Sequence, residues 1–185
     1  ERFEPPAAED IEAARQRVGW PKLTLADRPL TQPGGVYLDL SSIAKGFAVD
    51  KLAHLLEQAG ISNYLVEIGG ELRASGTKPQ GLPWRVAVER PIPGEREVEK
   101  VVPLRDLAIA SSGDYRNFFE KDGKLYSHTL DPRTGRPVEH KLGSVTVLHS
   151  SCATADGLAT ALTVLGPEKG LAFAEERELA VLFIV

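Results

Sequence analysis

The sequence predicts an α+β fold in which helices pack on one face of a mostly antiparallel sheet. Its extended segments follow one another and are mostly joined by short turns, as in hairpins. Its helical segments stand between groups of strands and do not alternate strictly with them, as they would in a parallel α/β fold. The chain has 185 residues, of which 42% are hydrophobic, and can bury a sizeable core. We therefore expect a single domain over residues 1–185.

The first third of the chain predicts two helices separated by short extended pieces. Residues 9–18 have an amphipathic pattern that stops at Gly19. Residues 20–38 carry short extended segments broken by prolines and glycines, which predicts a hairpin. Apolar residues then recur at helical spacing over 43–59 until Gly60 ends the run. This last segment is the central helix of the predicted fold.

The middle of the chain predicts mostly strands. Residues 71–75 either continue the preceding strand or pair back on it through a glycine bulge. Residues 91–97 are polar and predict an exposed loop, and the proline- and glycine-containing stretch 131–137 predicts a second loop. The predicted strands are 63–70, 84–89, 98–103, 106–111, 115–119, 125–130 and 144–149.

The last part of the chain predicts two further helices and a strand. The helices cover 153–165 and 167–176, with Gly166 and Pro167 between them. Proline at the first position of the second helix and Glu168 in its first turn fit the usual helix-start signals. Residues 179–185 are strongly apolar and predict a buried strand.

Composition narrows the possible function classes. A formal net charge of -4 and a pI near 5.6 argue against a nucleic-acid binder, whose surface would be basic. Lysine and arginine are scattered, without a polybasic run for a membrane surface. The single cysteine, Cys152, excludes an internal disulfide, and no apolar stretch is long enough to cross a bilayer. Both ends of the sequence look cut, so we expect a fragment of a longer protein.

The start of the central helix is a candidate anion site. Ser41 and Ser42 can cap the helix, whose first amides lack internal partners and whose dipole is positive at this end. Lys45 adds a full charge, and Gly46 leaves room for close approach of a ligand. The alternative is ordinary capping with a lysine that points to water, and the motif alone does not decide between the two.

A second candidate site lies more than a hundred residues later. Asp156 and Thr160 stand four apart in a helical segment, so their side chains share one face and offer two hard oxygen donors of the kind Mg²⁺ accepts. The alternative is a helix-start aspartate with a threonine that bonds its own helix backbone. Asp114 and His128 are further polar candidates near strand ends. A histidine there is more often structural, although its near-neutral titration suits proton transfer.

Five segments of the sequence stand out as a set, and they cover residues 39–50, 66–71, 111–115, 126–137 and 155–162. Together they resemble the ApbE family of FAD:protein FMN transferases. They occur in the order and at the spacings typical of that family, which makes the set specific where any one segment would be weak. The resemblance runs from about residue 9 to the end and implies an ApbE-like, T-fold-like version of the α+β fold.

The resemblance also implies an activity and a set of site residues. It implies an Mg²⁺-dependent enzyme that moves FMN from FAD onto a threonine hydroxyl of an acceptor flavoprotein and releases AMP. The metal ligands would be the carbonyl of Ser42, Asp156, the backbone near Ala159 and the hydroxyl of Thr160. Asp39, Lys45 and the backbone near Leu130 would contact the flavin nucleotide. His128 and Asp156 would be the catalytic residues.

The same resemblance suggests partners and a location. The acceptor would be a protein with a target threonine, such as a subunit of a bacterial membrane redox complex. The family usually has a longer amino-terminal region and a signal or lipoprotein leader, so we expect a carboxyl-terminal fragment that is incomplete at both ends. The full protein is then expected on the periplasmic side of the inner membrane. Two alternatives stay open: an FAD pyrophosphatase that yields FMN and AMP at the same metal site, and a non-catalytic FAD-binding module, which need not retain the pair Asp156 and Thr160.

Overall fold

A central antiparallel sheet organises the chain. In the computed structural model, the described residues are 6–25, 30–92, 94, 96–113, 118–121 and 124–185, with side chains undescribed at 118–121 and 124–125. Within these residues the sheet has five strands in the order β13-β12-β7-β4-β3, all antiparallel to their neighbours. The strands are β3 (Tyr64–Ile68), β4 (Glu71–Ser75), β7 (Leu107–Gly113), β12 (Ser144–His149) and β13 (Ala180–Ile184).

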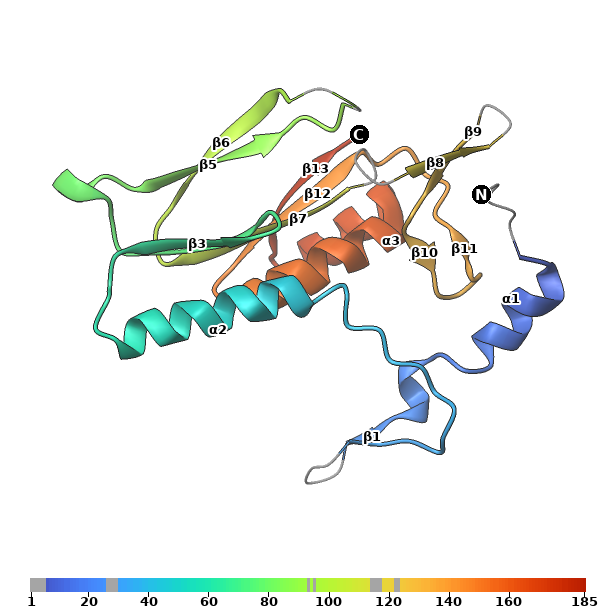
Figure 1. Cartoon of the computed structure of the whole chain (residues 1–185). Coiled ribbons are helices and arrows are strands. Elements are labelled where there is room, and N and C mark those ends of the chain that lie inside the picture. Colours follow the sequence, from blue (N-terminus) through green and yellow to red (C-terminus); the bar gives the residue numbers. More distant parts are fainter. Residues whose placement is uncertain (1–5, 26–29, 93, 95, 114–117, 122–123) are drawn as a thin grey trace.

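Helices cover one face of this central sheet (Figure 1). They are α2 (Ala44–Gln58) and α3 (Cys152–Glu176), which also pack on each other. Alternate residues of the strands point toward them, so Val145 and Val147 of β12 are fully buried against Leu162 of α3. This arrangement confirms the predicted α+β fold with helices on one face.

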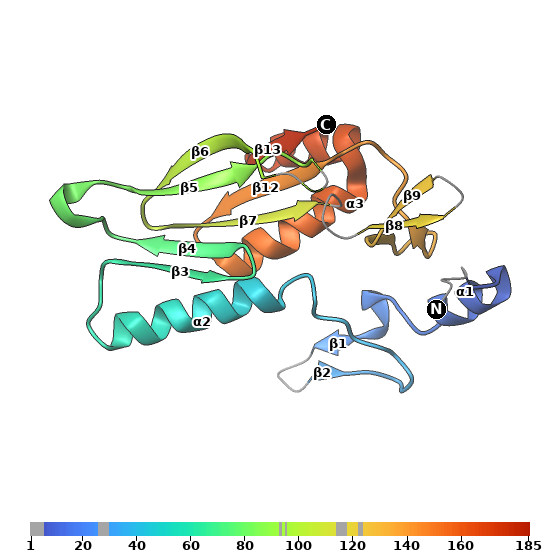
Figure 2. The same cartoon turned by 45° about the horizontal axis from the view of Figure 1, so that its top comes forward.

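A hairpin covers the opposite face of the central sheet (Figure 2). It is formed by β5 (Trp84–Glu89) and β6 (Val98–Leu104), which pair with each other. Val88 and Leu104 from the hairpin pack on Ala74 and Ile109, the residues of β4 and β7 that point away from the helices. The middle of the sheet is therefore covered on both faces, whereas the edge strand β3 keeps exposed residues such as Leu65.

The remaining described elements are short. The amino-terminal part extends away from the sheet, and two small hairpins lie beside one end of it in both views. These elements are α1 (Ala8–Arg15), the 3₁₀ turns Trp20–Lys22 and Pro79–Gly81, β1 (Thr24–Leu25), β2 (Leu30–Thr31), β8 (Phe118–Lys121), β9 (Lys124–Ser127), β10 (Leu130–Asp131) and β11 (Arg136–Pro137).

Most element boundaries agree with the sequence-based expectation. Gly60, with φ +78°, follows the end of α2 as expected. Residues 71–75 pair back on β3 through a turn in which Gly69 has φ +60° and Gly70 φ +101°, which settles the alternative left open by the sequence. Helix α3 is broken at Gly166, where φ is +80°, so the two expected helices are both present.

Two local expectations were wrong. Neither Ser41 nor Ser42 caps α2: its N-cap residue is Ile43, and no side-chain cap bond is present. The hydroxyl of Ser41 instead bonds the carboxylate of Asp39. The carboxyl-terminal strand is half-buried and not buried, because β13 pairs only with β12 at the edge of the central sheet. Residues 115–117 of the predicted strand 115–119 lie outside the described residues.

Candidate functional site

The start of α2 lies directly against the first turns of α3. The backbone N–H of Gly46 donates to Oδ2 of Asp156 at 2.9 Å, so an aspartate from α3 takes up one of the early amides of α2. A Cβ atom at Gly46 would come within 2.4 Å of the Cys152 carbonyl oxygen and 2.8 Å of the Asp156 Cβ. Glycine is therefore needed at position 46 for the approach of the two helices, whereas the sequence had suggested that it leaves room for a ligand.

Lys45 extends from the same turn toward the start of β4. Its Nζ is 2.7 Å from Oε1 of Glu71, which is only 1% exposed, while 45% of the Lys45 side chain is exposed. The second carboxylate oxygen of Glu71, Oε2, is buried and has no hydrogen-bond partner among the described residues. A Cβ at Gly69 would lie 3.2 Å from Cδ of Lys45, so the glycine turn before β4 also borders this pair.

The cluster contains more negative than positive charge. Burial raises the pKa of Glu71, and the nearby charge of Asp156 adds to this, while the hydrogen bond and charge of Lys45 oppose it. Burial also raises the pKa of Asp156, although the hydrogen bond from the Gly46 N–H and the charge of Lys45 act in the opposite direction. Two partly desolvated carboxylates with one ammonium favour an additional cation nearby.

The other predicted metal ligands lie around Asp156 and the α2 start. Ser42 is half-buried in the turn before α2, and Thr160 is half-buried one helical turn after Asp156. Ala159 is buried, and its carbonyl already accepts a hydrogen bond from the Thr163 hydroxyl at 2.9 Å. Ala159 is therefore the least available of the predicted donors.

No group of three or more His, Cys, Asp or Glu side chains that could hold a metal occurs in the part of the chain that the structure describes. The predicted shell contains one carboxylate with carbonyl and hydroxyl oxygens, so it does not require such a group.

The other predicted site residues lie on different elements. Asp39 is exposed, and its carboxylate accepts a bond from the Ser41 hydroxyl and, at 2.7 Å, one from the Ser41 amide; these bonds hold its pKa below the ordinary value. His128 is exposed between β9 and β10, and Leu130 is exposed in β10. Asp114 lies outside the described residues.

Sequence reasoning gave no role to three residues that organise this region. Glu71 holds Lys45, and Asp50 and Arg73 connect α2, β4 and the start of α3. Asp50 stands four residues after Gly46, a spacing that places both on one helix face and is the signal that could have found it.

Solved structures that share this fold are of proteins named flavin transferases. The flavinyl transferase ApbE from Pseudomonas stutzeri, in its apo form, is 50% identical with a TM-score of 0.88, over 98% of this chain and 56% of that chain. The flavin transferase ApbE from Vibrio cholerae is 47% identical with a TM-score of 0.89, over 100% of this chain and 59% of that chain.

The particular family follows from the sequence. The family model described as the ApbE family matches residues 1–183, and the chain belongs to this family. A curated relative from Vibrio cholerae, named FAD:protein FMN transferase, is 50% identical over 97% of this chain and 54% of its own length. The chain thus spans about half the length of the curated relatives it matches. The resemblance seen in the sequence is confirmed.

Proposed function

We propose that the full-length protein transfers FMN from FAD onto a threonine hydroxyl of an acceptor flavoprotein, with Mg²⁺ as cofactor and AMP as the second product. The name shared by the relatives, FAD:protein FMN transferase, supports flavin transfer. The observation that carries the proposal is the contact between Gly46 and Asp156, which joins the two candidate sites across 110 residues of sequence. This contact supports treating the candidate anion site and the candidate oxygen donors for a hard cation as one site.

The residues present fit an Mg²⁺ ion. The buried carboxylates of Glu71 and Asp156 share only the ammonium of Lys45, and Glu71 Oε2 lacks a partner among the described residues, so a further positive charge would be stabilised here. Asp156, the Thr160 hydroxyl and the Ser42 carbonyl would hold the ion. When bound, Mg²⁺ would neutralise charge on the phosphate oxygens of FAD.

The chain's own residues would bind and orient the FAD pyrophosphate. Lys45, fixed at one end by Glu71 and half-exposed, can direct its remaining N–H donors to phosphate oxygens. Glu71 holds this ammonium before the substrate binds, so the Lys45 side chain loses less conformational freedom on binding. Asp39 and the backbone near Leu130 would contact the nucleotide, as the family resemblance implies.

The transfer itself exchanges one phosphorus–oxygen bond for another. The threonine oxygen attacks the FMN-side phosphorus, the bond from that phosphorus to the bridging oxygen breaks, and AMP leaves with that oxygen. The hydroxyl proton passes to a base, for which His128 is the candidate. Such catalysis depends mainly on positioning and on charge stabilisation.

Replacing Asp156 tests the proposal. In the full-length protein, Asp156→Asn retains an oxygen that can accept the Gly46 N–H, so the fold is kept, but the charge is lost. We expect transfer of FMN from FAD to an acceptor protein to fall at least about 100-fold, because a lost metal ligand costs several kcal/mol of transition-state stabilisation. Flavin fluorescence of the acceptor on a denaturing gel measures the product. Glu168→Gln, an exposed acid on the same helix, is the matched control. Near wild-type transfer by Asp156→Asn would disprove the assignment.

Omitting the acceptor separates the alternatives. In a mixture of FAD and Mg²⁺, a transferase releases AMP only when the acceptor protein is present, whereas a pyrophosphatase releases AMP without the acceptor. A binding module releases none under either condition. Release of AMP without acceptor at the rate seen with it would overturn the transferase proposal in favour of hydrolysis.

The identity of the acceptor and the cellular location are inferred from the family resemblance alone. A subunit of a bacterial membrane redox complex as acceptor, and a location on the periplasmic side of the inner membrane, stay predictions. Across the described residues, no helix combines the length and apolar character needed to span a membrane.

A further inference from the structure

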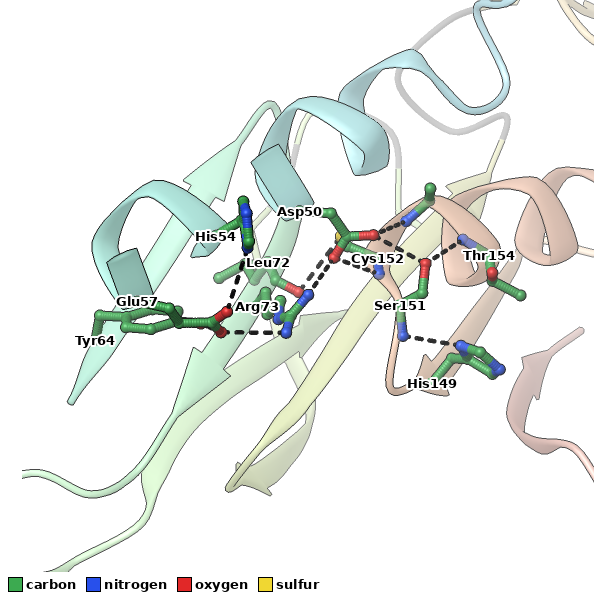
Figure 3. Close-up of polar contacts among 11 residues, drawn as sticks. Asp50, His54, Glu57, Tyr64, Leu72, Arg73, His149, Ser151, Cys152 and Thr154 are labelled. Carbon is green, nitrogen blue, oxygen red and sulfur yellow. Dashed lines mark hydrogen bonds and ion pairs between the residues drawn. The ribbon is translucent and has the colours of Figure 1, made fainter. Parts of the chain in front are cut away.

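Asp50 of α2 caps the start of α3 (Figure 3). Its Oδ1 accepts the backbone N–H of Cys152 at 3.0 Å, and its Oδ2 accepts the N–H of Ala153 at 3.0 Å and the hydroxyl of Ser151 at 2.8 Å. Ser151 is itself the N-cap residue of α3 and accepts the N–H of Thr154 at 3.2 Å. The first amides of α3 are thus satisfied mainly by a carboxylate about a hundred residues away in the sequence.

This cap is one half of a reciprocal pair. The N–H of Gly46, in the first turn of α2, bonds Asp156 of α3, while the N–H of Cys152, at the first residue of α3, bonds Asp50 of α2. Gly46 and Asp50 are four residues apart, as are Cys152 and Asp156, so each pair spans one helical turn on one face. One bond alone would let the helices pivot, whereas two bonds a turn apart fix both their rotation and their relative height.

Strand β4 supports both halves of the pair. Arg73 donates from Nη1 to Oδ1 of Asp50 at 2.8 Å, and from Nη2 to Glu57 at 3.3 Å. Glu71, two residues earlier and therefore on the same face of the strand, holds Lys45 at the start of α2. Strand β4 thus positions two groups: the ammonium of Lys45 and the carboxylate of Asp50, which caps α3.

The charge of Asp50 suits this role. Burial opposes its ionised form, but hydrogen bonds from the Ala153 and Cys152 amides and from Arg73 together hold its pKa below the ordinary value. The side chain is therefore a carboxylate at neutral pH, as a cap at the positive end of a helix requires.

We propose that Asp50 is a positioning residue for the Asp156 site. Its carboxylate fixes the first turn of α3 against α2 and so sets where the Asp156 carboxylate lies relative to Lys45 and Gly46. This inference rests on the proposed role of Asp156 as a metal ligand. It adds that the affinity of the site for Mg²⁺ depends on a residue that does not touch the ion.

Metal binding to the full-length protein tests this proposal. MgCl₂ is titrated into metal-free wild type, Asp156→Asn, Asp50→Asn and Arg73→Gln, and binding is followed by calorimetry, a readout that does not require turnover. We expect Asp50→Asn to bind Mg²⁺ about 10- to 100-fold more weakly, the usual loss when a residue that orients a ligand is replaced. Arg73→Gln leaves the amide bonds of Asp50 intact and should weaken binding in the same direction by less.

A destabilised control with an unchanged site separates positioning from general destabilisation. Val88→Ala removes buried volume on the opposite face of the central sheet, far from the two helices. It should lower the melting temperature yet leave the Mg²⁺ affinity within about twofold, since no part of the site moves. If Val88→Ala weakens binding as much as Asp50→Asn does, the positioning role is overturned.

The remaining outcomes are also decisive. If Asp50→Asn does not fold, as judged by circular dichroism, Arg73→Gln provides the test, and wild-type affinity in that variant overturns the proposal. If Asp50→Asn is folded and binds Mg²⁺ like wild type, the proposal also fails. If Asp156→Asn binds Mg²⁺ as tightly as wild type, the proposed function fails first, whatever Asp50 does.

Discussion

At the scale of single residues, Gly46 shows how one position serves packing and electrostatics together. Its missing side chain lets α2 approach the backbone of α3, and its amide then binds the Asp156 carboxylate. From the sequence, the glycine was interpreted as space for an incoming anion. The sequence could identify an unusual position but not its neighbour, because Asp156 is distant in the chain and only tertiary contacts bring it there.

Substituting alanine at Gly46 should therefore be costly. The added methyl would meet the Cys152 carbonyl oxygen at 2.4 Å, and backbone on both helices would have to move. We expect the free energy of unfolding to fall by about 1–3 kcal/mol despite the better helix propensity of alanine. Denaturant unfolding measures the change.

Gly157→Ala is the matched control for this substitution. Its methyl would meet only Cγ2 of Ile43, at 3.1 Å, on an exposed side chain that can rotate away. The change should be within about 1 kcal/mol. Equal effects of the two substitutions would contradict the role assigned to Gly46.

At the scale of elements, the break in α3 depends on a residue outside the helix. Pro167 has no N–H, so it cannot satisfy the carbonyl of Thr163 as a helix residue normally would. His140 takes that place: its Nδ1 accepts the Leu142 N–H at 3.3 Å, which leaves Nε2 as the donor to the Thr163 oxygen at 2.6 Å. The break itself was expected from Gly166 and Pro167. The compensating histidine was not, because it has no local signal.

Replacing His140 should destabilise this part of α3. His140→Ala leaves the Thr163 carbonyl without its donor and the Leu142 amide without its acceptor, and we expect a loss of about 1–3 kcal/mol. Thermal unfolding provides the measurement. His54→Ala, on the exposed side of α2, should change stability by no more than about 0.5 kcal/mol. A neutral result for His140→Ala would mean that solvent replaces both bonds.

At the scale of the whole molecule, the sheet order was the least predictable feature. Periodicity and glycine stops located α2, α3 and most strands, since these are local signals. The β5–β6 hairpin lies between β4 and β7 in the sequence but does not join the central sheet. It packs on the far face of that sheet, so that β4 pairs directly with β7. Both faces of each central strand are thus covered, which hydrophobic alternation within one strand does not specify.

The burial of Cys152 between the two helices and the central sheet has a consequence at alkaline pH. Burial, together with the charges of Asp50, Glu71 and Asp156, raises the pKa of the Cys152 thiol from 9.0 to about 12. Above pH 9 the unfolded chain releases this proton while the folded chain keeps it, so the folded state binds more protons and its stability falls as pH rises. The slope from this group is at most about 1.4 kcal/mol per pH unit.

Cys152→Ala should remove that slope between pH 9 and 10. Unfolding free energies of wild type and variant are measured in urea at steps of pH, and wild type should lose stability relative to the variant over this interval, whatever offset the lost thiol produces at pH 9. Above pH 10 both should lose stability, because burial and the hydrogen bond to Glu57 raise the pKa of Tyr64 from 10.0 to about 12. Parallel curves between pH 9 and 10 would contradict the shift at Cys152.

The contact between Gly46 and Asp156 also constrains how the protein is made. On a ribosome that adds about 5–20 residues per second, the aspartate emerges roughly 5–20 s after the glycine with which it pairs. β7 and β12 are made during that interval, but the first turn of α3, against which α2 packs, appears only at its end. Before Asp156 is made, the start of α2 therefore lacks the carboxylate that binds the Gly46 amide, and the proposed site is incomplete.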